Sequence, residues 1–559
     1  MGYKTPTCSI ARSCGGCEWL SVPYPIQLKR KQTQVEELLA PLASINNVTI
    51  EPIRGMDEPL AYRHKAATPF APGKGRTVRS GFYASGTHKI IASKECLVED
   101  GRARAILNDV AYLAGQFNIH AYQEDRGKGA LRHGVVRCGY ATDDVMLVLV
   151  VNGQHLPHEQ EFIAALRKAH PELTSIFLNV NQKRTNAILG RETRLLWGST
   201  SMSDKLLGCT FEIGPTSFYQ TNPQQTEVLY QLAIDGALAN CELADSEQIG
   251  ATQAGAALTD TSTQAATSAP ASSLRVLDAY CGTGTIGLCL AHAAEAQGIN
   301  LLLTGVDQVE NNIQMARRNA RNNKLEAEFI CDDATRYMQA LAKDGQNFDV
   351  IILDPPRAGS TPTFLKATAQ LAQKKIVYVS CNVVTQARDL KVLLDSGFAI
   401  ERVTPVDMFP HTKHVECVVV LSRVIMLLHG GGLSWWNYKA ETELLKDQYH
   451  VVLPILDGHA GSDSDFISIE ENASRLISFI DKEFGGSVLL IGGLSLGAQI
   501  LVEMLTQRNS ICQNAVIESA SIIPSKLTNA LIKPMFSLSY GLVKMKYFAQ
   551  MQFDYLHIR

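Results

Sequence analysis

The chain has 559 residues, of which 46% are hydrophobic and 19% charged, with 52 basic and 55 acidic side chains. This length exceeds one ordinary hydrophobic core, so we expect three or four domains, and the composition excludes a fibrous or largely disordered protein. Apolar runs such as VMLVLVV are much shorter than the roughly 20 residues of a membrane span. The first residues lack the apolar core of a signal peptide, so we expect a cytoplasmic protein with no membrane partner.

Basic residues gather at the beginning of the chain. Residues 1–137 carry 19 basic and 12 acidic side chains, whereas the remaining 422 residues carry 33 and 43. A local excess of positive charge on an acidic chain is typical of a surface that binds a polyanion. Chance clustering on a solvated surface is equally compatible with the charge alone.

The first 100 residues contain a cluster of cysteines. Cys8, Cys14 and Cys17 lie in CSIARSCGGC, and Cys96 lies in ASKECLVED. Thirteen cysteines in a cytoplasmic chain favour metal binding or catalysis over disulfides. Four thiolates suit either zinc or an iron–sulfur cluster, and the spacing alone favours zinc.

An amphipathic pattern predicts a helix over residues 26–41. Residues 48–235 alternate short strands with glycine turns, which predicts a mixed or antiparallel β domain. The expected strands are VTIEPI, RSGFYA, GVVRCGY, VMLVLVVN, SIFLNVN and CTFEIGP. The stretch 242–273 is rich in Ala, Ser, Thr and Gln and has no aromatic residue, which predicts a disordered insertion.

From residue 274 strands and helices alternate, which predicts an α/β fold with a doubly wound parallel sheet. The segment VLDAYCGTGTIGL reads as a strand, a glycine-rich turn and a helix, a pattern that nucleotide-binding dehydrogenases share. Acids end three successive strands, at Asp278, Asp307 and Asp333. They suit the ribose and adenine of S-adenosylmethionine better than NAD, because no pyrophosphate needs to be bound. The alternative is that these acids only cap the helices that follow.

Two further strands end in reactive side chains. VIILDPPRAGS places Asp354 and Arg357 after one strand, and YVSCN places Cys381 after the next. Free cysteines are most often small hydrophobic residues of a core, so Cys381 alone has a structural interpretation.

Taken together, the motifs resemble the bacterial RNA (uracil-5-)-methyltransferases, in particular the iron–sulfur-containing type that acts on 23S rRNA. The resemblance runs from Cys8 to about Arg423, interrupted by the insertion. It is carried by CGGCEW, YRHK, GFYASGTHKI, LRHGVVR, TNAILG, SFYQTNP, DAYCGTGTIGL, LDPPRAG, VSCN and MFPHTKHVECVVVL. It implies methyl transfer from S-adenosylmethionine to carbon 5 of a uridine in RNA. Ribosomal RNA is favoured over transfer RNA, because typical transfer-RNA members lack the cysteine motif. No obligate protein partner is implied.

The resemblance also assigns site residues. Uracil carbon 5 is a poor nucleophile until a thiolate adds to carbon 6, which is the role implied for Cys381. Glu416 matches the base that removes the carbon 5 proton. The positions that match the cofactor contacts of the family are Gln220, Tyr280, Asp307, Asp333 and Asp354. Asp307 stands where glutamate is usual, which shortens the expected contact with the ribose.

For the cysteine cluster the resemblance implies a 4Fe–4S cluster held by Cys8, Cys14, Cys17 and Cys96. Its expected role is structural and RNA-facing, because uridine methylation transfers no electrons. Many relatives carry a small β-barrel RNA-binding domain before the cluster, which we do not expect in this chain. RNA binding then falls to the basic 1–137 region. Its candidate residues are Lys29, Arg30, Lys31, Arg63, Lys65 and Arg132.

The last 136 residues resemble part of an α/β-hydrolase. VIMLLHGGG, LDGHAGSD and IGGLSLGAQ match its oxyanion strand, a loop and the nucleophile elbow, with Ser495 as the nucleophile. The single histidine after Ser495 is His557, which predicts an incomplete hydrolase that contributes nothing to methylation. Two alternatives remain, namely a serine esterase with an RNA-binding front half and a zinc-ribbon RNA-binding protein without catalysis. The expected domains are 1–100, 101–240, 241–273 (the insertion), 274–423 and 424–559.

Overall fold

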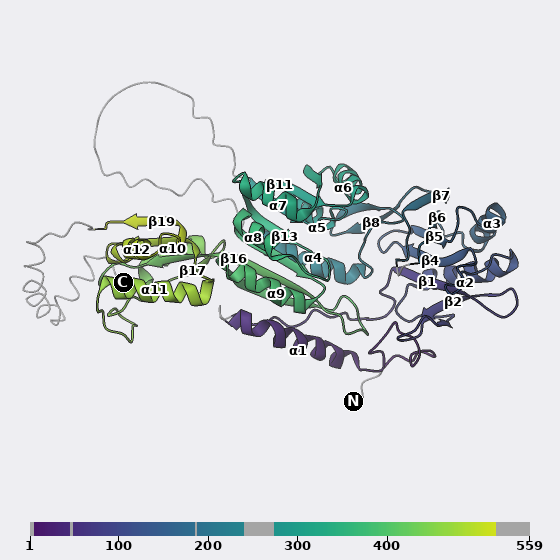
Figure 1. Ribbon diagram of the computed structural model, residues 1–559, viewed down its shortest axis with the longest axis horizontal. Helices are drawn as coiled ribbons and strands as arrows, with labels where there is room; N and C mark the ends of the chain where they lie inside the picture. The colour runs from purple at the N-terminus through teal and green to yellow at the C-terminus, as the bar shows by residue number, and fades with distance from the viewer. Residues whose placement is uncertain (1–4, 45–47, 185–186, 240–272, 521–559) are drawn as a thin grey trace, which may run out of the picture. The chain divides into compact units, whose positions relative to one another are not determined.

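The computed structural model describes residues 5–44, 48–184, 187–239 and 273–520 (Figure 1). Unit 1 takes in the described residues up to Val424 together with Leu445–His450 and Glu483–Gly485, and unit 2 takes in the rest. Within the described residues no helix is long and apolar enough to cross a membrane. The predicted insertion 241–273 lies outside the described residues except for its last residue.

Unit 1 begins with the predicted helix, α1 (Tyr24–Ala43), which starts with a proline in its first turn, where no hydrogen-bonded N–H is needed. A seven-stranded sheet follows, with the order β3-β2-β1-β4-β5-β6-β7 and one parallel pair, β5–β6. Helices α2 (Gly101–Gln116) and α3 (Glu159–Ala169) contribute to its core. The strands are β1 (Lys65–Pro72), β2 (Val78–Tyr83), β3 (Ile90–Ala92), β4 (Leu131–Cys138), β5 (Val145–Val151), β6 (Ser175–Val180) and β7 (Glu192–Gly198).

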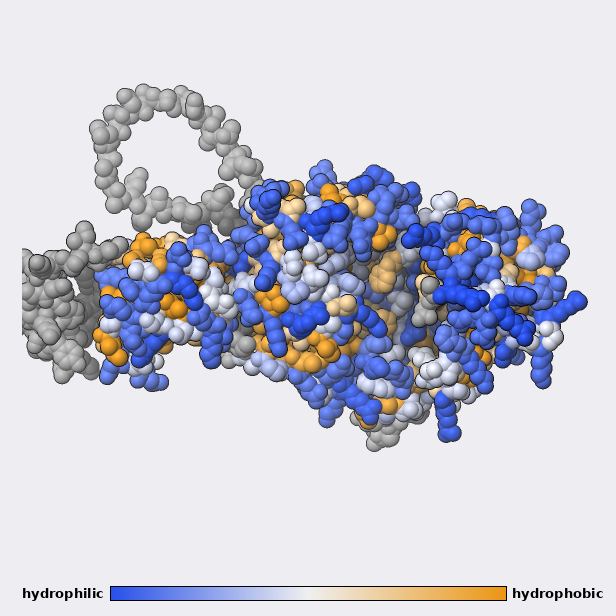
Figure 2. All heavy atoms as spheres, in the orientation of Figure 1, coloured by the Kyte–Doolittle hydropathy of each residue, from blue (hydrophilic) through white to orange (hydrophobic). Residues whose placement is uncertain are grey.

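This sheet confirms the prediction of a mixed β region and crosses residue 100, one of the expected boundaries. Figure 2 shows that hydrophilic residues cover most of the visible surface over strands β1–β7. A two-stranded sheet of β8 (Met202–Leu206) and β9 (Cys209–Ile213) follows, and then helix α4 (Pro223–Leu238).

One expected strand is wrong. VTIEPI, residues 48–53, forms no strand, although its β-branched residues suit one. Pro52 lacks an N–H group and so cannot donate to a strand ladder. Two backbone hydrogen bonds hold this segment, from Glu51 N to Val403 O and from Arg54 N to Pro405 O, both 2.9 Å.

The second sheet of unit 1 confirms the predicted α/β fold. Its order is β12-β11-β10-β13-β14-β16, and β15 pairs with β16. Strands β10–β14 are parallel, whereas β14–β16 and β15–β16 are antiparallel, which strand–helix alternation alone does not predict. The strands are β10 (Leu274–Ala279), β11 (Leu301–Asp307), β12 (Ala327–Cys331), β13 (Phe348–Leu353), β14 (Ala372–Ser380), β15 (Phe398–Val406) and β16 (Glu416–Leu428).

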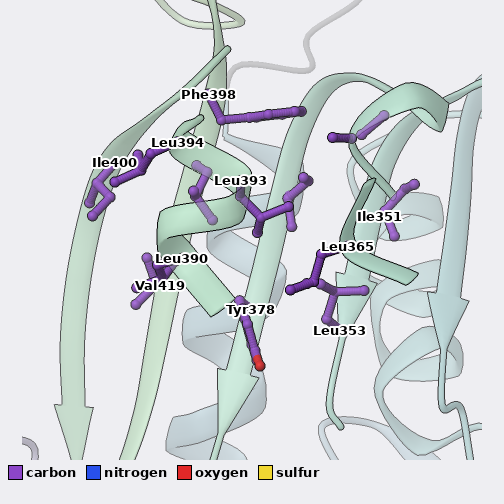
Figure 3. Close-up of a cluster of buried hydrophobic side chains, with 14 of the residues drawn as sticks. Ile351, Leu353, Leu365, Tyr378, Leu390, Leu393, Leu394, Phe398, Ile400 and Val419 are labelled. Atoms are coloured by element: carbon purple, nitrogen blue, oxygen red, sulfur yellow. The ribbon is translucent and has the colours of Figure 1, made fainter. Parts of the chain in front are cut away.

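Helices cover both faces of this sheet, so its strands are almost continuously apolar. Because side chains alternate along a strand, Ile351 and Leu353 join one buried cluster with α8 and α9, as Figure 3 shows, while Val350 and Ile352 join another with α4 and α5. The helices are α5 (Thr285–Ala296), α6 (Glu310–Asn322), α7 (Ala334–Lys343), α8 (Pro362–Leu371) and α9 (Val383–Leu394).

Unit 2 contains the strands and helices expected of a segment that resembles part of an α/β-hydrolase. The end of β16, from Ile425 on, pairs in parallel with β18 (Val488–Leu494), which pairs in parallel with β19 (Cys512–Glu518). The other elements are β17 (His450–Val452), which pairs with β16, and the helices α10 (Lys439–Leu445), α11 (Ile469–Phe484) and α12 (Leu496–Gln507).

Candidate active site

Strand pairing brings Asp354, Cys381 and Glu416 to one edge of the second sheet. Asp354 follows β13, and Cys381 follows β14, its parallel neighbour. Strand β16 runs antiparallel to β14, so Cys417 pairs with Ser380, and Glu416 comes next to Cys381. Paired strands lie about 4.8 Å apart, so three reactive side chains from distant parts of the sequence share one small region.

Both carboxyl groups at this edge hold their protons more tightly than usual. Burial, reinforced by the negative charge of Asp354, raises the pKa of Glu416 to about 8, although Arg357 opposes the shift. Burial alone raises the pKa of Asp354 to about 7. A carboxyl group with such a pKa exchanges protons near neutral pH, as an acid–base catalyst must.

The Cys381 thiol has a raised pKa of about 11. Burial is the main cause, followed by the negative charges of Glu416 and Asp354, whereas the charge of Arg357 and a hydrogen bond from it lower the pKa. Arg357 is therefore the cation that stabilises a thiolate here. The sequence places Arg357 after the same strand as Asp354 but assigns it no role.

The loop that carries Arg357 is fixed by the beginning of α9. Asn382 caps this helix, its Oδ1 accepting a hydrogen bond from Val384 N at 3.2 Å. Its Nδ2 donates to Arg357 O at 2.9 Å, and the Thr385 hydroxyl donates to the same oxygen at 3.3 Å. The residues around Cys381 thus hold the DPPR loop against the thiol.

The glycine-rich turn after β10 lies beside the same group of acids. Asp278 Oδ2 accepts from Gly287 N at 3.0 Å, while its Oδ1 is buried and without a hydrogen-bond partner. Burial raises the pKa of Asp278 to about 7, and the charges of Asp354 and Asp307 add to the shift. Gly284 has φ +80, which favours glycine, and a Cβ at Gly287 would come 2.9 Å from Asp278 Oδ2.

Asp307 and Asp333 end the two neighbouring strands as predicted. Asp307 accepts from Gly282 N at 3.2 Å and from Val309 N at 2.7 Å, so it closes the glycine-rich turn. Asp333 accepts from Arg336 N at 3.0 Å and caps α7, as the alternative interpretation expected. Capping uses one carboxylate oxygen of Asp333 and does not decide between the two interpretations.

The other two expected cofactor residues lie on different elements. Tyr280, with φ +66, follows β10, and its ring centroid lies 5.1 Å from that of Phe364. Gln220 lines a small cavity together with Lys65 and Tyr219. The donor set around the glycine-rich turn fits S-adenosylmethionine. It includes Asp278 Oδ1, which is buried without a hydrogen-bond partner, an open approach at Gly282, and the acids at the ends of successive strands.

The four predicted cluster cysteines come together around one pocket. Cys8, Cys14, Cys17 and Cys96 are free thiols that line it with Ile10, Ala11, Leu20, Phe82, Glu95 and Leu97. Burial raises the pKa of Cys17 to about 12. Among the residues that the structure describes, no group of three or more His, Cys, Asp or Glu side chains is placed to hold a metal ion. The side-chain positions therefore do not show a metal site.

Two of the predicted RNA-contacting residues are wrong. Lys31 is fully buried, and its Nζ donates to Asp407 Oδ1 and to Phe409 O. Arg132 is 6% exposed, and its guanidinium donates to Asn181 O and Lys183 O. The sequence did indicate the burial of Lys31, because this lysine lies four residues before Val35 on the apolar face of α1. Lys29 and Arg30 are exposed.

The loop before Glu416 depends on the N-terminal segment. Besides accepting from Lys31, Asp407 accepts from the Tyr24 hydroxyl at 2.7 Å. His411 O accepts from Trp19 N at 2.9 Å, and His411 N donates to Gln27 Oε1 at 2.9 Å. The segment next to the cysteines thus positions the loop that leads to the catalytic carboxyl candidate.

In unit 2 the expected strand–serine–helix turn is present. Ser495 lies between β18 and α12 with φ 51 and ψ −108, a strained conformation for a residue with a side chain. A Cβ at Gly493 would come 2.5 Å from Gly497 O, and one at Gly497 would come 2.2 Å from Leu428 O. Only glycine therefore fits at both positions. His557 lies outside the described residues.

Comparison with known proteins agrees with both units. The tRNA (Uracil-5-)-methyltransferase family model matches residues 251–424, and the alpha/beta hydrolase family model matches 425–557. An uncharacterised RNA methyltransferase of Halalkalibacterium halodurans is 39% identical over 415 residues, which are 74% of this chain and 82% of the relative. One of Bacillus cereus is 37% identical over 422 residues, with 75% and 84% covered.

A solved structure shows the same fold. The crystal structure of Pyrococcus abyssi tRNA (uracil-54, C5)-methyltransferase in complex with S-adenosyl-L-homocysteine is 26% identical, with a TM-score of 0.55. The match covers 73% of this chain and 86% of that one. The relatives, the family model and the fold agree, and the chain belongs to the RNA (uracil-5-)-methyltransferase family.

Proposed function

We propose that this chain transfers the methyl group of S-adenosylmethionine to carbon 5 of a uridine in RNA, with Cys381 as the nucleophile and Glu416 as the base. One observation carries the proposal. The antiparallel pairing of β14 with β16 brings Glu416 next to Cys381, and the negative charge of Glu416 raises the pKa of the Cys381 thiol.

In this mechanism Cys381 adds to uracil carbon 6, which turns carbon 5 into a nucleophile. S-adenosylmethionine supplies the electrophilic methyl group that carbon 5 takes. Glu416 then removes the carbon 5 proton, and the electron pair of that bond expels the Cys381 sulfur from carbon 6. The pKa of about 8 makes Glu416 a stronger base than an ordinary carboxylate.

Arg357 prepares the thiol for attack. Because the Cys381 pKa is about 11, the thiolate is scarce at neutral pH, and the positive charge of Arg357 favours the charged form. Asp307 would contact the ribose and Asp333 the adenine. The remaining cofactor contacts are proposed for Gln220, Tyr280 and Asp354.

Glu416→Gln tests the base directly. The amide cannot remove the carbon 5 proton, so methylated RNA should stay covalently bound to Cys381 and appear as a slower band on a denaturing gel. The double variant with Cys381→Ala should lose this band, and Cys512→Ala, which alters a thiol of unit 2, should leave turnover unchanged. Normal turnover of Glu416→Gln without an RNA-linked band would refute the assignment of the base.

We propose large-subunit ribosomal RNA as the substrate, because the cysteine motif accompanies that specificity in the family. Transfer RNA is the second candidate, favoured by the similarity to the Pyrococcus abyssi tRNA enzyme. Mass spectrometry of both RNA classes from a strain that lacks the gene decides between them. A 5-methyluridine missing only from tRNA would overturn the first choice.

We also propose that Cys8, Cys14, Cys17 and Cys96 hold a 4Fe–4S cluster, and that residues 1–240 bind RNA while residues 274–423 transfer the methyl group. The cluster proposal is supported by the four thiols that line one largely apolar pocket. Protein purified without oxygen should contain iron and sulfide and absorb broadly in the visible range. Stoichiometric zinc without visible absorption would favour the zinc alternative.

A further inference from the structure

A cavity distinct from the Gln220 cavity and from the cysteine pocket adjoins the Cys381 site. Arg63, Lys65, Thr221, Arg357, Phe409 and His414 line it, and we call it the cationic pocket, with a volume of about 280 Å³. Arg357 also lies close enough to the Cys381 thiol for its charge to lower the thiol pKa, and its backbone oxygen accepts from Asn382 Nδ2 at 2.9 Å, so the pocket and the thiol share one side chain. A polymer that presents one residue to Cys381 therefore presents its next residue to the cationic pocket.

Three basic side chains line the cationic pocket, and no acidic side chain does. In the described part of the chain neither Arg63 nor Lys65 belongs to an ion pair with a carboxylate, and Arg63 Nε donates only to the Tyr62 hydroxyl, at 3.3 Å. Burial, followed by the charge of Arg137, lowers the pKa of Lys65 to about 7. A buried cation without a carboxylate partner carries a desolvation cost, which a bound anion would offset.

The opposite wall is aromatic. The rings of Phe409 and His414 lie 6.4 Å apart at 81°, edge to face, and Phe409 is only partly buried. The Lys31 hydrogen bond to Phe409 O and the Thr412 hydroxyl bond to the same oxygen, at 2.8 Å, fix the backbone of this wall. Cations beside a partly exposed aromatic ring are a combination with which proteins bind single-stranded nucleic acid.

We infer that the cationic pocket binds the nucleotide next to the target uridine, with its phosphodiester on Arg63, Lys65 and Arg357 and its base against Phe409. The inference rests on the proposed function, because it takes the strand that enters the Cys381 site to be RNA. It assigns Lys65 and Phe409 to RNA binding rather than to methyl transfer.

The test measures binding of a fluorescent oligouridine by anisotropy over a series of salt concentrations. Lys65→Gln and Arg63→Gln should each weaken binding about tenfold and reduce the salt slope by about one. Phe409→Leu should weaken binding about tenfold without changing the slope, because stacking releases no counterions. Lys168→Gln, an exposed cation on α3, is the matched control and should leave both quantities unchanged.

Unchanged affinity and slope in Lys65→Gln and Arg63→Gln, with folding verified by thermal melts, would overturn the phosphate site. An unchanged affinity in Phe409→Leu would overturn the stacking of the base. Binding is measured without methyl transfer, so the two proposals fail separately. Reduced salt slopes in a protein that never methylates uridine would refute the proposed function and leave the pocket standing.

Discussion

Unit 1 and unit 2 both place a candidate nucleophile directly after a parallel β-strand, but they prepare it differently. Cys381 depends on charged groups from two separate segments, namely Asp354 and Arg357 in the loop after β13 and Glu416 at the start of β16. Ser495 depends on the backbone of one short turn, in which Gly493 and Gly497 permit its strained conformation. The first site is assembled by tertiary structure and responds to charge, whereas the second is built locally and responds to backbone sterics.

Replacement of each candidate nucleophile by alanine should give the largest difference between the two units. Cys381→Ala should lower methylation of RNA by at least about a thousandfold, because the proposed reaction begins with addition of the Cys381 thiolate to carbon 6. Ser495→Ala should leave methylation unchanged. Incorporation of the labelled methyl group measures both, and equilibrium dialysis should show that Cys381→Ala still binds S-adenosylmethionine. Equal losses in the two variants would contradict the separation of the sites.

Ion pairs provide a second contrast between the units. Lys31→Met leaves Asp407 buried and unpaired, which should lower the free energy of unfolding by about 3–5 kcal/mol. Asp481→Asn breaks a partly exposed pair with Arg508 in unit 2, whose side chains are 47% and 30% exposed, and should cost at most about 1 kcal/mol. Urea unfolding followed by circular dichroism measures both. Similar losses would show that burial does not decide the strength of these pairs.

The pH dependence of the release of methylated RNA should identify Glu416 as the base. A base acts only when deprotonated, so the release of methylated RNA should rise as pH increases towards 8, by about tenfold per unit below its pKa, and then level off. Glu416→Asp should keep a rise with pH, whereas Glu416→Gln should lose it. Single-turnover release measured from pH 6 to 9 checks this. A flat profile in the unaltered enzyme would exclude a carboxyl group with a raised pKa as the base.

Removal of residues 424–559, which contain all of unit 2 and two short segments of unit 1, should have the smallest effect. A chain ending at Arg423 keeps the guanidinium bonds of that residue to Ala372 O and Ser396 O and keeps the whole Cys381 site. We expect methylation within about twofold of the full chain, because Asp354, Arg357, Cys381 and Glu416 all precede Arg423. Loss of activity in a truncated chain that folds would show that unit 2 contributes to the reaction.

Local patterns predicted much of this molecule. The strands β10–β14, the acids that end them and the serine turn were readable because each depends on neighbouring residues. The burial of Lys31 against Asp407, the effect of Arg357 on the Cys381 pKa, and the antiparallel pairing of β14 with β16 each join segments that are not neighbours in the sequence. No local pattern specifies which distant partner a polar side chain will meet.

The bonds that hold the loop before Glu416 also bear on how the protein folds. Lys31 and Asp407 are 376 residues apart. At about 5–20 residues per second, a ribosome needs roughly 20–75 s to make the intervening chain. During that time α1 has an apolar face and a lysine without their partners, and contacts of such high sequence separation form slowly. The active site is therefore completed late, and its assembly should be the step most sensitive to chaperones and to temperature.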